Sequence, residues 1–533
     1  MTYTIAPDPA TGKTRVDLQW DTQNRVISAI GVSPRWMGIE RVPELLEDVA
    51  IEGGAVKREA SRWIIEHKKG ATLRFSYVVN PGRKAIDWKS TGYPVATPDF
   101  FHGFGNAFLL TPEPGGDVPS TYTALLRWKL PSEWKAVCSW GAGKSVATMI
   151  DAADLRHSAY VAGKLSVKES AAGGRPVTVA MLNKFGFETD DFVQLATKII
   201  AKECEFMRDT TFPAFVITVV PVGDAVSENG SQLSGSGLYN SFAMFMAPEN
   251  KLNDAVEHLF AHELFHYWNG RVLGAASPEG LVMWFTEGLT DYYARRILFE
   301  SGIWNAATYS KWTNRQIRQY VWNPAANASN EKIKEQFWRE RDTVGEAAYQ
   351  RGMMLGLRWH KLARDHGVKD GLDALLHALL DRARQEKFEL SNEGIRRIGR
   401  EVLGEWFAAE FDQHVARAET VEVPLDALVP ALHGKQSRAY EFDLGFHQDK
   451  TLKARKVIGL KPGSAAEKAG LREGDELAGW DVYTDADQET TLTIRRDGKV
   501  KKISFYPRGE SRGAVQFAPA ASAPQTEKKP RKP

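Results

Sequence analysis

The chain has 533 residues, of which 43% are hydrophobic and 26% are charged. This balance is typical of a globular protein with about three or four domains, and it excludes bulk disorder. The formal net charge is +2, so composition gives no electrostatic reason to expect nucleic acid or a membrane surface as a partner.

Two further features narrow the class of protein. Only two cysteines occur, Cys138 and Cys204, which excludes a disulfide framework and a zinc site built mainly from thiolates. The longest apolar run, 214–222, is too short for a membrane span, which needs about 20 residues. Because no basic segment followed by an apolar one opens the sequence, we expect a cytoplasmic location for the chain as written, or a periplasmic or secreted one if the N-terminus has been processed.

The N-terminal part, residues 1–170, is expected to form a β-sandwich. Residues 72–79 alternate between apolar and polar side chains, as a half-buried strand does. Similar short runs at 15–20, 25–32 and 63–66 are separated from one another by Gly/Pro punctuation. This spacing indicates many short antiparallel strands.

The next part, 171–432, has the pattern of a mixed sheet followed by helices. Residues 189–207 carry apolar side chains at helical spacing, between two short apolar runs that predict strands. Residues 238–246 follow a Gly/Ser-rich loop and are expected to form an edge strand. Helical patterns then recur in five segments, at 284–301, 309–321, 344–365, 371–385 and 392–418.

The C-terminal part returns to strands at 436–508. Two of them, at 491–496 and 500–505, are joined by Asp497-Gly498, a strong hairpin signal. Residues 511–533 are rich in Ala, Pro and Ser and end in basic side chains, which predicts a disordered tail. The whole chain is therefore expected to be a multidomain α+β protein.

The decisive motif is His262-Glu263-Leu264-Phe265-His266. Residues four apart on a helix share a face and lie about 6 Å apart along the axis, so both imidazoles can bind one metal ion. Glu263 lies beside that face, where it can act as a general base on a water at the metal. His258 extends the stripe by one turn, but about 12 Å of helix separates it from His266, so we interpret it as a packing residue or one that supports a ligand.

A catalytic zinc ion needs a third protein ligand and an open position. Glu287 is the candidate, because 20 residues separate it from His266 and leave room for a turn and a second helix. Asp291 lies one turn further on and can accept a hydrogen bond from a ligand histidine. The sequence therefore predicts one Zn²⁺ per chain.

These residues resemble the gluzincin zinc metallopeptidases, and most closely the glycyl aminopeptidase family. The first motif continues Tyr267-Trp268-Asn269, the second reads Glu287-Gly288-Leu289-Thr290-Asp291-Tyr292-Tyr293, and a later segment reads Tyr349-Gln350-Arg351-Gly352. The resemblance implies a thermolysin-like catalytic domain at 171–432 that hydrolyses peptides. It also implies that Tyr349 donates a hydrogen bond to the oxyanion.

The resemblance further places a substrate-binding strand at Gly237, Leu238, Tyr239 and Asn240. In the family a glutamate of this strand holds the free amine of the substrate, and here Tyr239 stands in its place. A neutral phenol cannot pair with an ammonium group by charge. The sequence therefore favours an aminopeptidase acting on small N-terminal residues (Gly or Ala), and it leaves open an endopeptidase or oligopeptidase, or a zinc-binding pseudoenzyme that acts as an interaction protein.

The segment 462–475 is similar to the signature of PDZ domains, which often follow the catalytic domain in this family. The resemblance implies that 436–508 form a PDZ-like domain. Leu444, Gly445 and Phe446 then correspond to the loop whose backbone N–H groups bind the C-terminus of a peptide. A peptide C-terminus is accordingly a possible second partner beside the peptide substrates.

Overall fold

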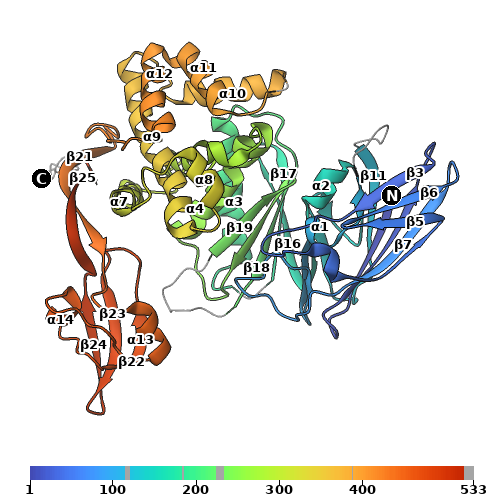
Figure 1. The fold of residues 1–533 in the computed structure, drawn as a ribbon, viewed down its shortest axis with the longest axis horizontal. Helices are drawn as coiled ribbons and strands as arrows, with labels where there is room; N and C mark the ends of the chain where they lie inside the picture. The colour runs from blue at the N-terminus through green and yellow to red at the C-terminus, as the bar shows by residue number, and fades with distance from the viewer. Residues whose placement is uncertain (114–120, 183–184, 224–232, 387, 521–533) are drawn as a thin grey trace, which may run out of the picture. The chain divides into compact units, whose positions relative to one another are not determined.

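The computed structural model describes residues 1–113, 121–182, 185–223, 233–386 and 388–520. Contacts between residues divide the chain into two compact units, one made of 1–226 and 231–264, the other of 227–230 and 265–533. Along the sequence, strands predominate up to Met246 and from Leu432 onward, and most of the helices come between these two parts (Figure 1). The prediction of a multidomain α+β protein is therefore confirmed.

Three sheets build the N-terminal part of the first unit. The six-stranded sheet has the order β14-β11-β1-β2-β7-β4, the four-stranded sheet β10-β3-β6-β5, and the five-stranded sheet β13-β12-β15-β9-β8. Their strands are β1 (Thr2–Pro7), β2 (Thr14–Asp21), β3 (Ile27–Gly31), β4 (Leu46–Glu52), β5 (Gly54–Glu59), β6 (Arg62–His67), β7 (Thr72–Val79), β8 (Val95–Ala96), β9 (Phe100–Phe104), β10 (Thr111–Pro112), β11 (Thr121–Trp128), β12 (Lys135–Cys138), β13 (Gly141–Ala142), β14 (Ser145–Asp151) and β15 (Ala159–Gly163). Three short helices interrupt them: η1 (Val42–Leu45), α1 (Gly105–Phe108) and α2 (Ala152–Arg156).

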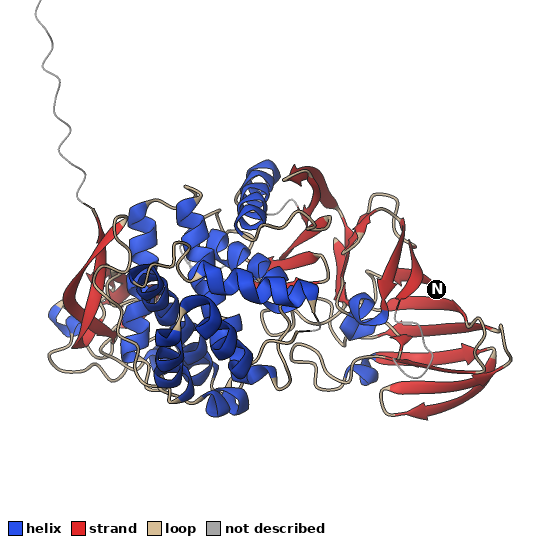
Figure 2. Ribbon diagram, turned by 90° about the horizontal axis from the view of Figure 1, so that it is seen from above, coloured by secondary structure: helices blue, strands red, loops and turns tan. Residues whose placement is uncertain are grey.

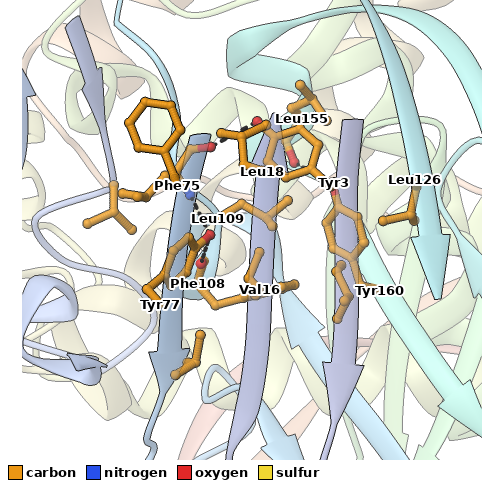
Figure 3. Close-up of a cluster of buried hydrophobic side chains, with 14 of the residues drawn as sticks. Tyr3, Val16, Leu18, Phe75, Tyr77, Phe108, Leu109, Leu126, Leu155 and Tyr160 are labelled. Atoms are coloured by element: carbon orange, nitrogen blue, oxygen red, sulfur yellow. Dashed lines mark hydrogen bonds between the residues drawn. The ribbon is translucent and has the colours of Figure 1, made fainter. Parts of the chain in front are cut away.

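Alternating side chains explain why these segments are strands. In β2, Val16, Leu18 and Trp20 are buried while the residues between them face outward. Figure 3 shows this core, in which two phenols donate to backbone carbonyls, Tyr3 to Leu110 at 2.8 Å and Tyr77 to Phe108 at 3.1 Å. The strands expected at 15–20, 25–32, 63–66 and 72–79 are thus confirmed.

A second five-stranded sheet completes the first unit, in the order β16-β17-β18-β20-β19. Its central strands β17, β18 and β20 are parallel, whereas β16 and β19 pair antiparallel at the two edges. The predicted boundary at 170 falls inside β16. The elements of this part are β16 (Leu165–Ala172), β17 (Arg175–Leu182), α3 (Thr189–Phe206), β18 (Phe215–Pro221), β19 (Leu233–Leu238), β20 (Ser241–Met246) and α4 (Asp254–Phe265).

The prediction of one edge strand at 238–246 is wrong. The chain makes a hairpin there, because Tyr239 and Asn240 form a two-residue turn in which Asn240 adopts a φ of 45°. Strand β20 is buried along its whole length and is paired on both sides, so it offers no edge for a peptide. The strand at this edge of the sheet is β19, and β16 lies at the opposite edge.

Helices form the first part of the second unit. The predicted helix at 284–301 is two helices that meet at Glu287, and the helix predicted at 392–418 is likewise divided. The elements are η2 (Tyr267–Val272), η3 (Glu279–Val282), α5 (Met283–Thr286), α6 (Gly288–Glu300), α7 (Ala306–Trp322), α8 (Asn330–Gln336), η4 (Arg341–Gly345), α9 (Glu346–Asp365), α10 (Asp373–Gln385), α11 (Asn392–Leu403), α12 (Glu405–Phe411) and η5 (Asp412–Ala416).

The C-terminal part of the second unit holds two small sheets. Strands β22, β23 and β24 form one, and β21 pairs with β25 in the other, which Figure 2 shows as a long twisted ribbon beside the helices. Asp497 and Gly498 both adopt positive φ in the turn between β23 and β24, as the hairpin signal predicts. The elements are β21 (Leu432–Phe442), α13 (Gln448–Ala454), α14 (Ala465–Lys468), β22 (Glu476–Asp481), β23 (Thr490–Arg496), β24 (Lys499–Phe505) and β25 (Arg508–Pro519).

The prediction of disorder from 511 onward is wrong for the first part of that segment. Residues 511–519 belong to β25, which pairs with β21 and buries Val515 and Phe517. Helix α7 holds this strand in place, since Ser310 and Asn314 both donate to the carbonyl of Phe517. Residues 521–533 lie outside the described residues.

Within the described parts of the chain, no helix has both the length and the apolar character needed to cross a bilayer.

Candidate active site

Helix α4 carries the first half of the candidate metal site. Its start is capped by Asn253, whose side-chain oxygen accepts hydrogen bonds from the N–H groups of Ala255 and Val256. Several apolar side chains of the helix are buried, among them Phe260, Leu264 and Phe265, and His262 is only 7% exposed. A polar ring held in such surroundings needs a partner, because burial without one costs free energy.

His266 follows directly after α4, and its environment fixes the direction of its ring. Its Nδ1 lies 3.2 Å from the carbonyl oxygen of Asn269, and its Nε2 lies 3.5 Å from Oε2 of Glu287. A proton on Nδ1 donated to that carbonyl leaves Nε2 as a lone-pair donor facing Glu287. In this tautomer Nε2 carries no proton and can bind a metal ion.

His262, His266 and Glu287 together offer three ligand atoms that all lie within 4.8 Å of one another. Two donors bound at about 2.1 Å to one tetrahedral ion lie about 3.4 Å apart, close to the 3.5 Å between His266 and Glu287. Two imidazoles and one carboxylate are also a donor set that zinc prefers in catalytic sites. The residues therefore fit one Zn²⁺ ion.

A second group of potential ligand atoms consists of His258, His262 and Asp291. Asp291 is already engaged, because Arg295 donates to its carboxylate at 2.8 Å and both side chains are buried. A carboxylate neutralised in this way is a poor ligand for a cation. The expected roles therefore stay predictions: His258 is a packing residue or one that supports a ligand, and Asp291 is an acceptor for a ligand histidine.

Glu263 lies beside the edge strand of the sheet. Its Oε2 accepts a hydrogen bond of 3.2 Å from the N–H of Gly237 in β19. Gly235 lies two residues before Gly237 in the same strand. A Cβ on Gly235 would lie 3.3 Å from the Cγ of Glu263 and would collide with the ring of Phe242. Small residues in β19 thus let the backbone approach the predicted general base closely.

Tyr239 occupies the turn next to this strand, and its ring faces the N-terminal core. The ring packs against the large hydrophobic cluster of the N-terminal sheets. Its N–H donates to the carbonyl of His157 at 2.7 Å, and its carbonyl accepts from the hydroxyl of Ser241 at 2.9 Å. These contacts give Tyr239 a structural role beside any role in binding a substrate.

Tyr349 lies on α9, which packs closely against the junction that holds Glu287. Gly352, one turn later, has no room for a Cβ, which would collide with the carbonyl of Trp284 and lie 2.6 Å from the Cα of Gly288. The ring of Tyr349 stacks on Phe337, with centroids 6.2 Å apart. The glycine in the Tyr-Gln-Arg-Gly segment therefore brings the two helices together at the level of the third predicted ligand.

Charged side chains border Tyr349. The guanidinium of Arg341 lies 4.6 Å from the centre of the Tyr349 ring and 3.6 Å from the carboxylate of Glu346. Burial raises the pKa of Glu346, and the charge of Arg341 opposes this effect while that of Asp291 adds to it. The guanidinium of Arg341 thus lies over the face of the Tyr349 ring.

Asn269 is a site residue that the sequence analysis named only as part of a motif. It is fully buried, and its Nδ2 donates to the carbonyls of Phe285 and Thr286 and to the hydroxyl of Thr290. Its own carbonyl orients His266. Asn269 therefore links the predicted ligand His266 to the helix pair that carries Glu287.

The three residues predicted to bind a peptide C-terminus already make contacts within the protein. Leu444 and Phe446 are buried in the core of the C-terminal sheet region. The N–H of Gly445 donates to the carboxylate of Asp443 at 2.9 Å, and its carbonyl accepts from the N–H of Lys461. Carboxylate binding at this loop stays a prediction, with one backbone donor already used.

The model of the M61 glycyl aminopeptidase family matches residues 255–355. That segment includes every predicted zinc ligand, the general base and Tyr349. This segment belongs to the M61 glycyl aminopeptidase family. The chain is accordingly a zinc metallopeptidase of the aminopeptidase-like type, and the enzyme class predicted from the sequence is confirmed.

Solved structures share the fold around this M61 segment. An aminopeptidase N family protein from Idiomarina loihiensis is 15% identical, with a TM-score of 0.68 over 96% of this chain and 97% of that chain. A variant of the M1 zinc metallopeptidase of Deinococcus radiodurans, bound to a Tyr-Ser-Ala substrate, is 13% identical, with a TM-score of 0.50 over 80% of this chain and 94% of that chain. At these identities the likeness shows the fold alone. No curated protein sequence matches this one.

Proposed function

We propose that the chain is an aminopeptidase that removes small N-terminal residues, Gly or Ala, from peptides and uses one zinc ion per chain. The observation that carries this proposal is the convergence of ligand atoms from His262, His266 and Glu287 within 4.8 Å. The match to the glycyl aminopeptidase family supports the choice of an aminopeptidase and of a small first residue.

The side chains have distinct tasks in the proposed reaction. His262, His266 and Glu287 would hold the zinc ion, which would lower the pKa of a bound water towards about 7 and would polarise the scissile carbonyl. Glu263 accepts a proton from the attacking water and delivers it to the leaving amine. Tyr349 donates a hydrogen bond to the oxygen on which negative charge develops. Strand β19 pairs with the backbone of the peptide along its outer edge.

An endopeptidase or oligopeptidase is the second candidate, and Tyr239 is the observation that favours it. Its ring packs into the N-terminal core, and a phenol carries no charge to pair with an ammonium group at neutral pH. The edge of β19 can bind an extended peptide backbone whether or not the peptide begins there.

Peptide pairs with free and acetylated N-termini distinguish the two candidates. For a series that begins with Gly, Ala, Leu or Phe, we expect the free Gly and Ala peptides to be cleaved fastest. We expect acetylation to lower kcat/KM by about tenfold or more, because a buried contact to a charged amine is worth about 1.5–3 kcal/mol. Equal cleavage of both members of each pair would establish the endopeptidase instead. Addition and removal of a chelator in the same assay checks that the hydrolysis depends on metal.

The organisation predicted from the sequence stays part of the proposal. We infer an N-terminal β-sandwich, a thermolysin-like catalytic domain and a C-terminal PDZ-like domain. The first boundary moves to the start of β16 and the second to the start of β21, because a domain boundary does not divide a paired strand. Strand β25 then belongs to the ordered C-terminal part.

A further inference from the structure

Segment 323–345, which connects helices α7 and α9, supplies several of the groups that contact the ring of Tyr349. Phe337 stacks on this ring, and the guanidinium of Arg341 lies 4.6 Å from the centre of the Tyr349 ring and 4.9 Å from the centre of the Phe337 ring. The Tyr349 ring also packs against a buried apolar cluster, whose members from this segment are Ala325, Ala328, Ile333, Phe337 and Val344. The direction of the ring therefore depends on where the segment lies.

Arg351, two residues after Tyr349, holds the first part of this segment. Its guanidinium donates to three acceptors just before and at the start of α8, which are the carbonyl oxygens of Ala326 and Ala328 and the side-chain oxygen of Asn330. Phe337 directly follows the other end of this short helix. Arg351 thus fixes the helix that places Phe337 against the ring.

The burial of Arg351 is costly for the fold. Its side chain is 1% exposed, and no carboxylate of the described residues lies at ion-pair distance from it. Burial lowers the pKa of Arg351 to about 10. Because removing a charge from water without a charged partner is unfavourable by several kcal/mol, stability alone does not account for an arginine at this position.

Gln350, the residue between Tyr349 and Arg351, holds the last part of the segment through Asn323. The side-chain amide of Asn323 donates to Oε1 of Gln350 at 2.8 Å and to the carbonyl oxygen of Thr343 at 2.9 Å. Thr343 lies in the turn η4, which begins with the guanidinium-bearing residue over the Tyr349 ring. The two residues that follow Tyr349 therefore hold both the first and the last part of the segment that contacts its ring.

We propose that Gln350 and Arg351 are positioning residues for Tyr349: they fasten segment 323–345 to α9, and the segment directs the phenol towards the oxyanion. This inference rests on the proposed role of Tyr349 as the oxyanion donor. A displacement of about 1 Å in a group of this kind can lower the rate about 10²-fold. Both residues act through the Tyr349 hydroxyl, so their effect on catalysis disappears when that hydroxyl is removed.

The test is a double-mutant cycle with Tyr349→Phe. Gln350→Met removes the amide and keeps the length of the side chain, whereas Arg351→Lys keeps the charge and removes the planar fork that reaches three acceptors. We expect each variant to lower kcat about 10- to 100-fold with little change in KM or zinc content. In the Tyr349→Phe background we expect no further fall in kcat, while any fall in melting temperature should be the same in both backgrounds.

Arg364→Lys is the matched control, because it makes the same chemical change on the same helix at an exposed position. It should keep the wild-type kcat. An equal fall in kcat with and without the Tyr349 hydroxyl, or no fall in either variant while Tyr349→Phe alone is slow, would overturn the inference and leave the oxyanion role of Tyr349 intact. Wild-type kcat in Tyr349→Phe alone would overturn both. If Arg351→Lys fails to fold, Gln350→Met decides alone.

Discussion

Glu263→Gln is expected to keep its zinc and to lose at least about a hundredfold in kcat. General-base catalysis contributes about 10²- to 10⁴-fold, and an amide cannot accept the proton from the attacking water. The geometry should survive, because the hydrogen bond from the N–H of Gly237 to Oε2 of Glu263 can be kept by the amide oxygen of glutamine. The loss should therefore fall on kcat, with little change in KM.

Steady-state kinetics with a good substrate, together with the zinc content of each protein, checks this expectation. Glu257→Gln is the matched control, since it makes the same chemical change on the same helix and should retain wild-type kcat. Turnover of Glu263→Gln near the wild-type rate would refute the assignment of Glu263 as the base. Loss of zinc together with activity would give Glu263 a role in holding the metal.

Tyr349→Phe is expected to lower kcat by about 10²- to 10³-fold, because one donor to an oxyanion is worth about 3–4 kcal/mol. The substitution removes the hydroxyl group alone. Stacking on Phe337 and the contact with the guanidinium of Arg341 both involve the ring, so Phe at this position should keep the packing and the zinc affinity.

The measurement is again kcat and KM, now with thermal unfolding as a second readout. Tyr506→Phe serves as the control, because it removes the hydroxyl group of a tyrosine that is 46% exposed. It should leave kcat, KM and the melting temperature unchanged. A Tyr349→Phe enzyme with wild-type kcat would show that the oxyanion is stabilised without this phenol. A large fall in melting temperature would show that the hydroxyl serves the fold.

Local geometry explains why the ligand residues could be predicted. The spacing of His262 and His266 fixes their common face through the helix alone, and Glu287 was found because a zinc site needs a third ligand. The strands of the N-terminal sheets could also be predicted, because alternation of apolar and polar side chains in segments such as 72–79 is typical of a half-buried strand.

The features that could not be predicted from the sequence depend on tertiary contacts. The hairpin at Tyr239 and Asn240 lacks a strong turn sequence, and it forms because both flanking strands are paired in the sheet. Strand β25 has too many Ala, Pro and Gly residues to show its alternation, and its pairing with β21 spans residues far apart in sequence. The role of Asn269 depends on acceptors 16 to 21 positions later in the chain.

Crystals grown with zinc and measured at the zinc absorption edge test the central claim most directly. The account predicts a single strong anomalous peak about 2 Å from one ring nitrogen of His262, one ring nitrogen of His266 and a carboxylate oxygen of Glu287. A strong peak elsewhere, or none at these three residues under saturating zinc, would contradict the convergence on which the hydrolytic function depends.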